Sequence, residues 1–401
     1  MKETTKKTSK AKKIVGIILG ALLAIIFILC IIVGCIWHNE IRSIASIKAI
    51  TPQDLSHDDG YTYQMTVYGD YYMEDFLAQG GVSSDSELIS FLSNHITRGL
   101  MNIGIETTDI SCSSITATTA DGDRIFGRNY DFAQTNNCIV YTAPSDGRHA
   151  SVSTIDLQFI SIENEVGIDG IMDYVMTLAA PYVPLDGMND AGVSCGIYMT
   201  YQGEPTIATD QQTDKPDITS TTLLRLILDY ADSVDEAVEI AMQYDLHDSA
   251  GTSYHYMVAD ATGKSAILEW VGNTDVTDND GGARTLNVIY NTNDTAMGTD
   301  AYQVVTNFIV TPDYYASDDE KAGFDRYEYL RTNLENLDGI VADEEEAMNL
   351  LAGVGRRSWN NDDSNGITVH SVVYNLTDKT AVWVGNEHYG EEDYTFYLDL
   401  N

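Results

Sequence analysis

Cys112 is the residue whose neighbours best equip it for chemistry. It opens a β-prone run, and an Asp-Gly turn at 120–123 joins that run to a second one ending at Phe132. This pattern is typical of a hairpin, which would bring Arg128 and Asp131 back beside the thiol. A neighbouring arginine favours the nucleophilic thiolate, and a carboxylate can orient an amine. The pattern predicts a cysteine nucleophile, although a lone cysteine is more often structural.

A serine nucleophile is the first alternative. Gly192 to Gly196 matches the G-x-S-x-G pattern around Ser194. That pattern works on a sharp turn from a strand into a helix. Here a turn-like stretch, 189–192, precedes the motif, and the β-prone stretch 197–201 follows it. We therefore expect Ser194 to be a strand residue.

A metal centre is the second alternative. The chain has no H-E-x-x-H motif and no paired C-x-x-C motif. The histidines considered as ligands lie apart in the sequence, namely His247, His255, His370 and His388. Asp275, Asp278 and Asp280 lack the spacing of a calcium loop. We therefore predict neither a metal nor any other cofactor.

The Cys112 hairpin resembles the opening of the choloylglycine hydrolase family, on Cys112 to Ile115, Asp121-Gly122 and Phe126-Gly127-Arg128-Asn129-Tyr130-Asp131. That wider group includes bile salt hydrolases, penicillin V acylases and acid ceramidase. Further segments match in the same order, namely 186–192, 260–269, 305–308, 325–327 and 371–375. The resemblance covers most of 112–384.

The resemblance implies an α+β fold of the N-terminal-nucleophile (Ntn) hydrolase type, an αββα four-layer sandwich. It also implies that the nucleophilic cysteine is a chain N-terminus, whereas 111 residues precede Cys112. We therefore expect autocatalytic cleavage of the Ser111–Cys112 bond. Residues 112–401 would be the catalytic domain, and 51–111 a retained light segment docked by a helix over 85–102.

The resemblance also implies the reaction, which is hydrolysis of a linear N-acyl amide through a thioester on sulfur. The implied roles are Cys112 as nucleophile, Arg128 beside the thiolate, Asp131 on the α-amine, Asn189 and Asn307 as oxyanion donors, and Arg326 completing the charge network. An acyltransferase of the same fold and an inactive ligand-binding surface domain remain open.

Three of these roles have alternatives. Asn189 also fits a simple turn residue, and Asn291 competes with Asn307. Arg326 also fits a helix-surface cation paired with a glutamate. Two adjacent arginines in a turn-rich stretch, Arg356 and Arg357, compete with it.

The elements around these residues support an α+β class. We expect strand pairs at 113–119 with 124–129, 254–260 with 265–271, and 368–375 with 380–384, and further strands at 285–291 and 302–310. Helices are expected at 221–231, from Ser233 onwards, at 325–333 and at 344–351. Strands in antiparallel pairs with helices in separate groups argue against alternating βαβ units.

The composition limits the partners. The 401 residues include 22 Lys+Arg and 61 Asp+Glu, a formal charge of −39, which argues against nucleic acid as a partner. The five cysteines exclude a disulfide-stapled miniprotein. The pairing of Cys138 with Cys195 cannot be predicted from their spacing, and the sequence does not predict self-association.

The N-terminus predicts a membrane anchor. Residues 1–13 form a basic tail with six lysines, and 14–37 carries no charge, enough to span about 30 Å of hydrocarbon as a helix. The lysines place the tail in the cytoplasm and the catalytic domain outside, beyond a stalk at 38–50. A cleaved signal peptide is one alternative. A lipoprotein anchored at Cys35 is another, because residues 32–35 resemble a lipobox.

Overall fold

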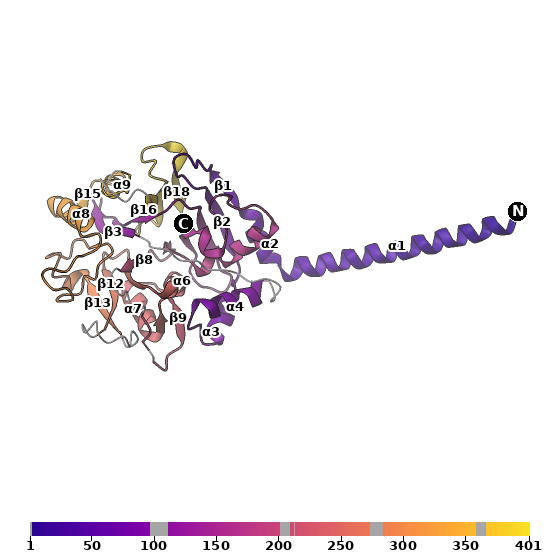
Figure 1. Ribbon diagram of the computed structural model, residues 1–401, viewed down its shortest axis with the longest axis horizontal. Helices are drawn as coiled ribbons and strands as arrows, with labels where there is room; N and C mark the ends of the chain where they lie inside the picture. The colour runs from indigo at the N-terminus through magenta and orange to yellow at the C-terminus, as the bar shows by residue number, and fades with distance from the viewer. Residues whose placement is uncertain (1, 97–110, 201–208, 212, 273–283, 358–365) are drawn as a thin grey trace.

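The computed structural model describes residues 2–96, 111–200, 209–211, 213–272, 284–357 and 366–401. In these ranges the chain forms two large sheets flanked by helices (Figure 1). The nine-stranded sheet runs in the order β1 (Lys48–Thr51), β2 (Thr62–Tyr68), β5 (Asn137–Ala143), β6 (Ser151–Asp156), β7 (Asp186–Asn189), β8 (Ser194–Thr200), β11 (Ser253–Ala259), β12 (Ser265–Val271), β13 (Thr285–Tyr290).

The seven-stranded sheet carries Cys112. Its order is β14 (Val304–Val305), β3 (Ser111–Thr119), β4 (Arg124–Phe132), β16 (Ile367–Asn375), β17 (Thr380–Gly385), β18 (Thr395–Asp399), and β15 (Ile340–Val341) also pairs with β3. The predicted hairpins β3–β4, β11–β12 and β16–β17 are all present as antiparallel pairs. Not every pair is antiparallel, because β2 runs parallel to β5.

Helices cover the outer face of each sheet. α6 (Ser220–Tyr230) and α7 (Val234–Gln243) pack on the nine-stranded sheet, and α8 (Phe324–Asn336) and α9 (Glu344–Ala352) pack on the seven-stranded sheet (Figure 1). As the sequence predicted, α7 begins after Ser233, whose side chain accepts a hydrogen bond from the backbone of Glu236. The layers are helix, sheet, sheet, helix, which is the α+β sandwich that we expected.

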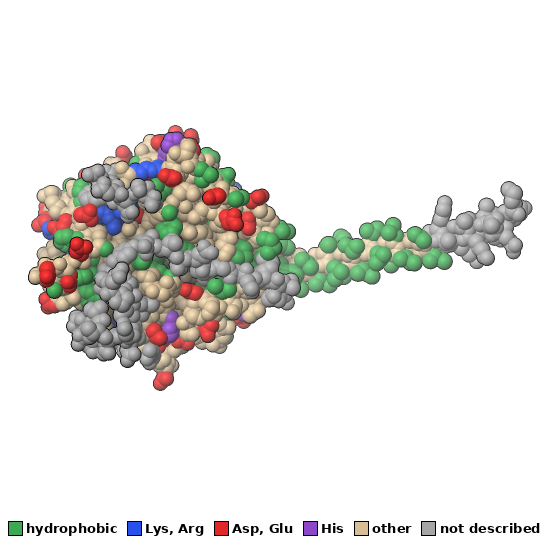
Figure 2. All heavy atoms as spheres, in the orientation of Figure 1, with side chains coloured by type: hydrophobic (Ala, Val, Ile, Leu, Met, Phe, Trp, Pro, Cys, Tyr) green, Lys and Arg blue, Asp and Glu red, His purple; other side chains and the backbone are tan. Residues whose placement is uncertain are grey.

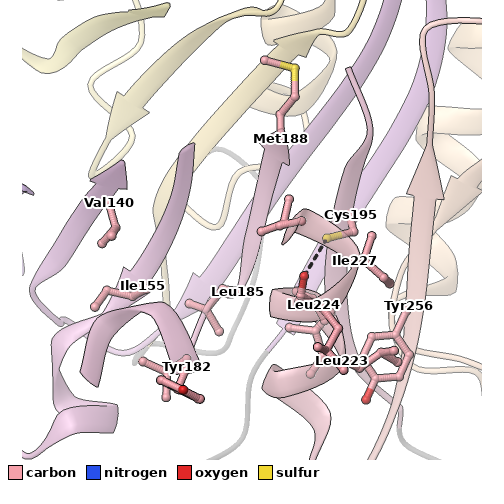
Figure 3. Close-up of a cluster of buried hydrophobic side chains, with 14 of the residues drawn as sticks. Val140, Ile155, Tyr182, Leu185, Met188, Cys195, Leu223, Leu224, Ile227 and Tyr256 are labelled. Carbon is pink, nitrogen blue, oxygen red and sulfur yellow. Dashed lines mark hydrogen bonds between the residues drawn. The ribbon is translucent and has the colours of Figure 1, made fainter. Parts of the chain in front are cut away.

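Apolar side chains hold these layers together. Figure 3 shows the layer between α6 and the nine-stranded sheet, where Leu224 and Ile227 lie against Cys195 of β8. A second cluster joins α8 and α9 to the outward face of β3, through Ile115 and Leu351 among others. Burial of each such side chain stabilises the fold by roughly 1.5–3 kcal/mol. These contacts hold the helices on the outer faces of both sheets.

The remaining elements are short. The structure has α3 (Met73–Ala78), α4 (Asp85–Ile96), α5 (Ile171–Met176), the parallel pair β9 (Asp217–Thr219) and β10 (Asp245–His247), and 3₁₀ turns at Leu157–Ile160, Thr177–Tyr182, Ser249–Gly251, Asn291–Asn293 and Glu392–Tyr394. α4 begins where the 85–102 helix was predicted, and residues 97–110 lie outside the described residues.

The N-terminal helix α1 (Lys2–Ile36) projects away from the folded body, and apolar side chains cover its described part (Figures 1 and 2). Lys13–Ile36 is long and apolar enough to cross a membrane, and none of its apolar window is buried. This agrees in length and composition with the predicted anchor, and a signal sequence passes the same test.

Residues 38–50 do not form an isolated stalk. They form α2 (His38–Ser46) and the start of β1, and Ser43 is fully buried against β2. The hydroxyl of Ser43 accepts a hydrogen bond from the backbone of Tyr68, and Ser46 accepts one from Thr66. The predicted stalk is therefore part of the folded body, because its serines satisfy the edge of β2.

The strand expected at 302–310 is also shorter than predicted. Only Val304–Val305 pairs with β3. Beyond it, the backbone N–H groups of Val310 and Thr311 donate to the carboxylate of Glu269 instead of to a neighbouring strand. A side chain thus replaces the ladder that the β-prone composition predicted.

Candidate active site

Cys112 is the second residue of β3, and its thiol is fully buried. In the β3–β4 ladder, Cys112 lies opposite Tyr130, and Ser111 lies opposite Asp131. The Nη2 atom of Arg128 donates to the sulfur at 3.4 Å. The hairpin therefore brings Arg128 to the thiol, as the sequence predicted.

Strand alternation separates the two charged residues of β4. Phe126 and Tyr130 face the nine-stranded sheet, so Arg128 points the same way, towards the thiol. Asp131 lies on the opposite face, where its carboxylate accepts hydrogen bonds from Thr368 at 2.7 Å and from Arg326 at 3.3 Å. Arg128 and Asp131 thus lie on opposite sides of the sheet beside Cys112.

Arg326, near the start of α8, ties the site together. Its Nη1 atom donates to the carbonyl oxygen of Cys112 at 2.7 Å and to the Ser113 hydroxyl at 2.7 Å, and its Nη2 atom donates to Oδ1 of Asn307 at 2.8 Å. Gly323 makes room for it, because a Cβ there would lie 2.6 Å from Nη2.

The competing arginines make other described contacts. Arg357 forms an ion pair with Asp59 at 2.8 Å. The backbone N–H of Arg356 donates to the Thr368 hydroxyl at 2.9 Å. Of the three arginines, Arg326 is the one whose side chain contacts Cys112.

Asn307 faces the backbone of Cys112. Its Oδ1 atom accepts a hydrogen bond from the Cys112 N–H at 3.0 Å, and its Nδ2 atom donates to the carbonyl of Met199 at 2.8 Å. Asn291 instead braces a turn, donating to the carbonyls of Gly263 and Asp300. The structure thus brings Asn307 to Cys112, with its oxygen towards the nitrogen.

The structure does not bring Asn189 to this cluster by any contact it describes. The Asn189 side chain accepts from the backbone of Ala191 at 3.1 Å and of Val193 at 3.0 Å, and donates to the carbonyl of Ala231 at 2.8 Å. Its oxygen therefore stabilises the β7–β8 turn, and its nitrogen ties that turn to the end of α6. This is the turn residue that the sequence left as the alternative, and Gly192 completes the turn with a φ of +81°.

Three residues of the site, Asp186, His370 and Tyr198, were not predicted as site residues from the sequence. Asp186 of β7 lies 3.1 Å from Nε of Arg128, and it also accepts from His370 at 2.8 Å. The guanidinium of Arg128 lies 4.6 Å from the ring centroid of Tyr198, a cation–π contact. The alternation of side chains along β8 predicts which face of its sheet Tyr198 lies on. The sequence does not show that this face lies against Arg128, because that depends on how the two sheets stack.

Close packing explains the glycine two residues before Tyr198. A Cβ at Gly196 would lie 2.6 Å from Nη1 of Arg128 and 2.6 Å from the Tyr198 hydroxyl. That hydroxyl donates to Ser114 of β3 at 2.5 Å, which joins the two sheets beside the thiol. Arg128 is therefore enclosed by groups from both sheets.

The electrostatics favour the protonated thiol of Cys112. Burial raises the pKa of Cys112 to about 11 and Asp131 adds to this, whereas Arg128 and Arg326 act in the opposite direction. Burial also raises the pKa of Asp131. Although burial opposes it, the charges of His370 and Arg128 lower the pKa of Asp186. Asp186 is thus the ionised partner of Arg128 at neutral pH.

The other candidates lie apart from this cluster. Ser194 begins β8, as a strand residue, and its hydroxyl donates to the carbonyl of Gly187 at 2.7 Å. Cys138 and Cys195 are free and buried, and burial raises the pKa of both thiols. Among the described residues, two groups could approach one metal ion, Asp210 with Asp245 and His247, and Asp70 with Glu74 and Asp146. No described contact links either group to Cys112.

Comparisons with known proteins point the same way. The family model of the linear amide C–N hydrolases, choloylglycine hydrolase family, matches residues 112–319. The bile salt hydrolase/transferase of Clostridium perfringens (strain 13 / Type A) is 26% identical over 169 residues, which are 39% of this chain and 47% of that protein. The match thus spans about half the length of that relative.

Two solved structures resemble this chain, and the first of them supports the fold. A variant of the conjugated bile acid hydrolase from Clostridium perfringens has a TM-score of 0.50 at 18% identity, covering 72% of this chain and 92% of that one. Penicillin V acylase from Agrobacterium tumefaciens has a TM-score of 0.46 at 17% identity, covering 72% and 86%. Because the family model begins at Cys112 and spans more than half of the sequence, this chain belongs to the choloylglycine hydrolase family of linear amide C–N hydrolases.

Proposed function

We propose that this chain hydrolyses linear N-acyl amides, with Cys112 as an N-terminal nucleophile released by cleavage of the Ser111–Cys112 bond. One observation carries the proposal. The nitrogen, the carbonyl oxygen and the sulfur of Cys112 each contact a different polar side chain, from Asn307, Arg326 and Arg128 respectively. A buried structural cysteine needs partners for its backbone but no cation on its sulfur, whereas a residue that uses both its sulfur and its nitrogen needs side chains that fix both groups.

The first reaction is self-cleavage. The sulfur of Cys112 attacks the carbonyl carbon of Ser111, the C–N bond breaks, and the nitrogen of Cys112 leaves as a free amine. Water then hydrolyses the Ser111 thioester and returns the thiol. The raised pKa of Cys112 makes this step slow at neutral pH, because little thiolate is present before the chain is cut.

Turnover uses the amine that cleavage releases. An α-amine has a pKa of about 7.7–8.0, so it can take the thiol proton and pass it to the leaving amine at neutral pH. Arg128 stabilises the thiolate and Asn307 holds the nitrogen, while Asp131 and Arg326 complete the charge network. For Asn307 to serve as an oxyanion donor, its Nδ2 atom must leave the carbonyl of Met199.

The light segment is expected to remain bound after cleavage. β2 lies inside the nine-stranded sheet, between β1 and β5, and its Met65 and Val67 are buried. The hydroxyl of Tyr71 donates to Asp229 of α6 at 2.6 Å. Losing the segment would expose this apolar surface and a sheet edge, so residues 51–111 act as part of the catalytic body.

The substrate class follows from the family, and the acyl group is left open. The relatives described above are named for bile salts, conjugated bile acid and penicillin V. A second activity, transfer of the acyl group to an amine, is favoured by the name hydrolase/transferase of the curated relative. Transfer differs only in which nucleophile opens the thioester on Cys112.

We further propose that α1 anchors the protein in a membrane with the catalytic body outside. Six lysines precede the apolar window and the body is strongly acidic, which supports this orientation. A lipid on Cys35 is the alternative anchor, and both arrangements place the same body outside. Protease treatment of intact cells distinguishes this orientation from its reverse, in which the body is protected.

The test uses the full chain in detergent. Intact-mass analysis should find a heavy fragment that begins at Cys112, and a panel of N-acyl amides should reveal hydrolysis with release of the amine. Adding a competing amine to the same assay measures acyl transfer. An uncut chain without turnover on the panel would contradict the proposal and favour an inactive ligand-binding surface domain.

A further inference from the structure

Two buried side chains behind the site hold the segment that carries Asn307. His255 of β11 and Glu269 of β12 lie opposite each other in the ladder, and both side chains are fully buried. Nδ1 of His255 lies 2.8 Å from Oε1 of Glu269, and Nε2 lies 2.8 Å from the carbonyl oxygen of Thr306. The histidine thus links the hairpin to the residue that precedes Asn307.

Glu269 holds the other side of the same segment. Its carboxylate accepts hydrogen bonds from the backbone of Val310 and of Thr311, both at 2.8 Å, and from the Thr311 hydroxyl at 2.6 Å. Because β14 ends at Val305, these bonds replace a strand ladder. The two side chains therefore fix the backbone on both sides of Asn307.

The hydrogen-bond roles make the pair interdependent. A carbonyl oxygen can only accept, so Nε2 of His255 carries a proton and donates it to Thr306. A second proton lies between Nδ1 and Glu269. Removing Glu269 leaves Nδ1 of the buried His255 without a partner, and removing His255 takes its donor from the carbonyl oxygen of Thr306. An unpaired buried polar group costs about 1–3 kcal/mol.

The same histidine contacts the thiol side of the site. Its ring meets that of Tyr198 edge to face, with centroids 5.7 Å apart, and Tyr198 packs under the guanidinium of Arg128. His255 thus contacts a neighbour of each of two site residues, Thr306 next to Asn307 and Tyr198 next to Arg128. None of its described contacts is with Cys112 itself.

We propose that His255 and Glu269 are positioning residues that hold Asn307 against the nitrogen of Cys112. The proposal rests on the proposed function for its kinetic readout, and it goes beyond the contacts of Cys112 itself. A displacement of about 1 Å in a catalytic group can cost on the order of 10²-fold in rate. Weakening the pair is therefore expected to lower kcat much more than it changes KM.

The experiment compares two graded variants with a matched control in the full chain. Glu269→Gln keeps the size of the side chain but replaces one acceptor by a donor. Thr311→Val removes a hydroxyl that donates to Glu269 and accepts from Asn287, and leaves the backbone bond of Thr311 to Glu269 in place. Thr285→Val removes an exposed hydroxyl on the adjacent strand β13. We expect kcat to fall at least about tenfold in Glu269→Gln, less in Thr311→Val, and not at all in the control, with KM within about twofold throughout.

Hydrogen exchange provides the second readout and does not depend on turnover. Exchange should rise at 306–311 in Glu269→Gln and in Thr311→Val, while the rest of the nine-stranded sheet remains protected. Unchanged kcat in a folded Glu269→Gln variant, or an equal rise in exchange across the whole sheet, would overturn the positioning role. If the wild-type chain is inactive, the proposed function fails, and exchange at 306–311 alone decides whether the pair holds the segment.

Discussion

Nη1 of Arg326 lies 2.7 Å from the carbonyl oxygen of Cys112, although the two residues are 214 positions apart in the chain. The same guanidinium reaches Oδ1 of Asn307, which accepts the N–H of Cys112. Both backbone groups of the nucleophile are therefore fixed before the Ser111–Cys112 bond is cut. In this geometry, cleavage would release an amine that already has a partner.

Cys112→Ala should abolish both self-cleavage and turnover while leaving the fold intact. The loss should be on the order of 10⁴-fold or more, because no other group replaces the nucleophile. Intact mass and hydrolysis of the N-acyl amide panel measure the two effects. Cys138→Ala, at a buried thiol of β5, is the control and should be cut and active. Amide hydrolysis by Cys112→Ala would show that another residue is the nucleophile.

Arg326→Lys should lower kcat about 10²-fold, because lysine keeps the charge but cannot reach two acceptors from one planar group. The comparison is Arg331→Lys on the same helix, whose half-exposed side chain pairs with Glu328 and Glu335. Steady-state kinetics with one substrate should separate the two variants. Equal kcat values in the two variants would show that Arg326 has no role in catalysis.

The reactivity of the thiol should depend on whether the chain has been cut. In uncut chains the raised pKa keeps Cys112 protonated up to about pH 11, so its alkylation by iodoacetamide should rise about tenfold per pH unit from pH 8 to 10. In cut chains the α-amine can take the proton, so alkylation should level off near pH 8.

Mass spectrometry can follow both populations in one sample. Uncut chains and fragments that begin at Cys112 differ in mass, and each can be digested and scored for the alkylated peptide. Cys195 is the internal control, because its thiol is equally buried and burial also raises its pKa. Labelling of Cys195 at the same rate as Cys112 would mean that the fold had opened. The same pH profile in both populations would contradict a proton transfer to the new N-terminus.

Asp186→Asn should destabilise the fold by about 3–5 kcal/mol, because it leaves the buried Arg128 without its partner. Urea unfolding of an uncut Cys112→Ala background would measure this difference. Asp190→Asn, which affects a half-exposed ion pair with His149, should cost at most about 1 kcal/mol. Similar losses in both variants would mean that the Arg128 pair adds no special stability.

The same pair predicts a pH dependence. The pKa of Asp186 is lowered in the folded protein from its ordinary value of 3.8, so its stabilisation is present above pH 3.8 and is lost as the pH falls through the lower folded value. The difference between the parent and Asp186→Asn should therefore be constant near pH 6 and shrink below pH 4. A constant difference down to pH 2 would show that Asp186 is not ionised when folded.

Asn189→Ala should affect stability and not catalysis. Its side chain satisfies two backbone groups of the β7–β8 turn and the carbonyl of Ala231, so its loss should cost about 1–3 kcal/mol. The kcat/KM of the folded protein should stay within about twofold of the parent, while Asn307→Ala should lose about 10²-fold or more. If Asn189→Ala lost kcat while keeping full stability, Asn189 would be an oxyanion donor, as the family resemblance implied.

The sequence by itself determined the local part of this site. The Asp-Gly turn and the β-prone runs on either side of it fix the β3–β4 hairpin, so Arg128 meets Cys112 through contacts close along the chain. The helix signals at Ser233 and the apolar window after the basic tail are local in the same way. Such patterns can be read because they depend on residues a few positions apart.

Only the tertiary structure decided the rest. Asp186 and Tyr198 reach Arg128 from the other sheet, which no spacing within either strand specifies. Asn189 fits a turn and an oxyanion donor equally well until its hydrogen bonds are known. Residues 306–310 leave their predicted strand, and a buried glutamate takes the backbone N–H groups of Val310 and Thr311. The physical reason is common to all three: a buried polar group must find a partner, and the stacking of the two sheets decides which partner lies within reach.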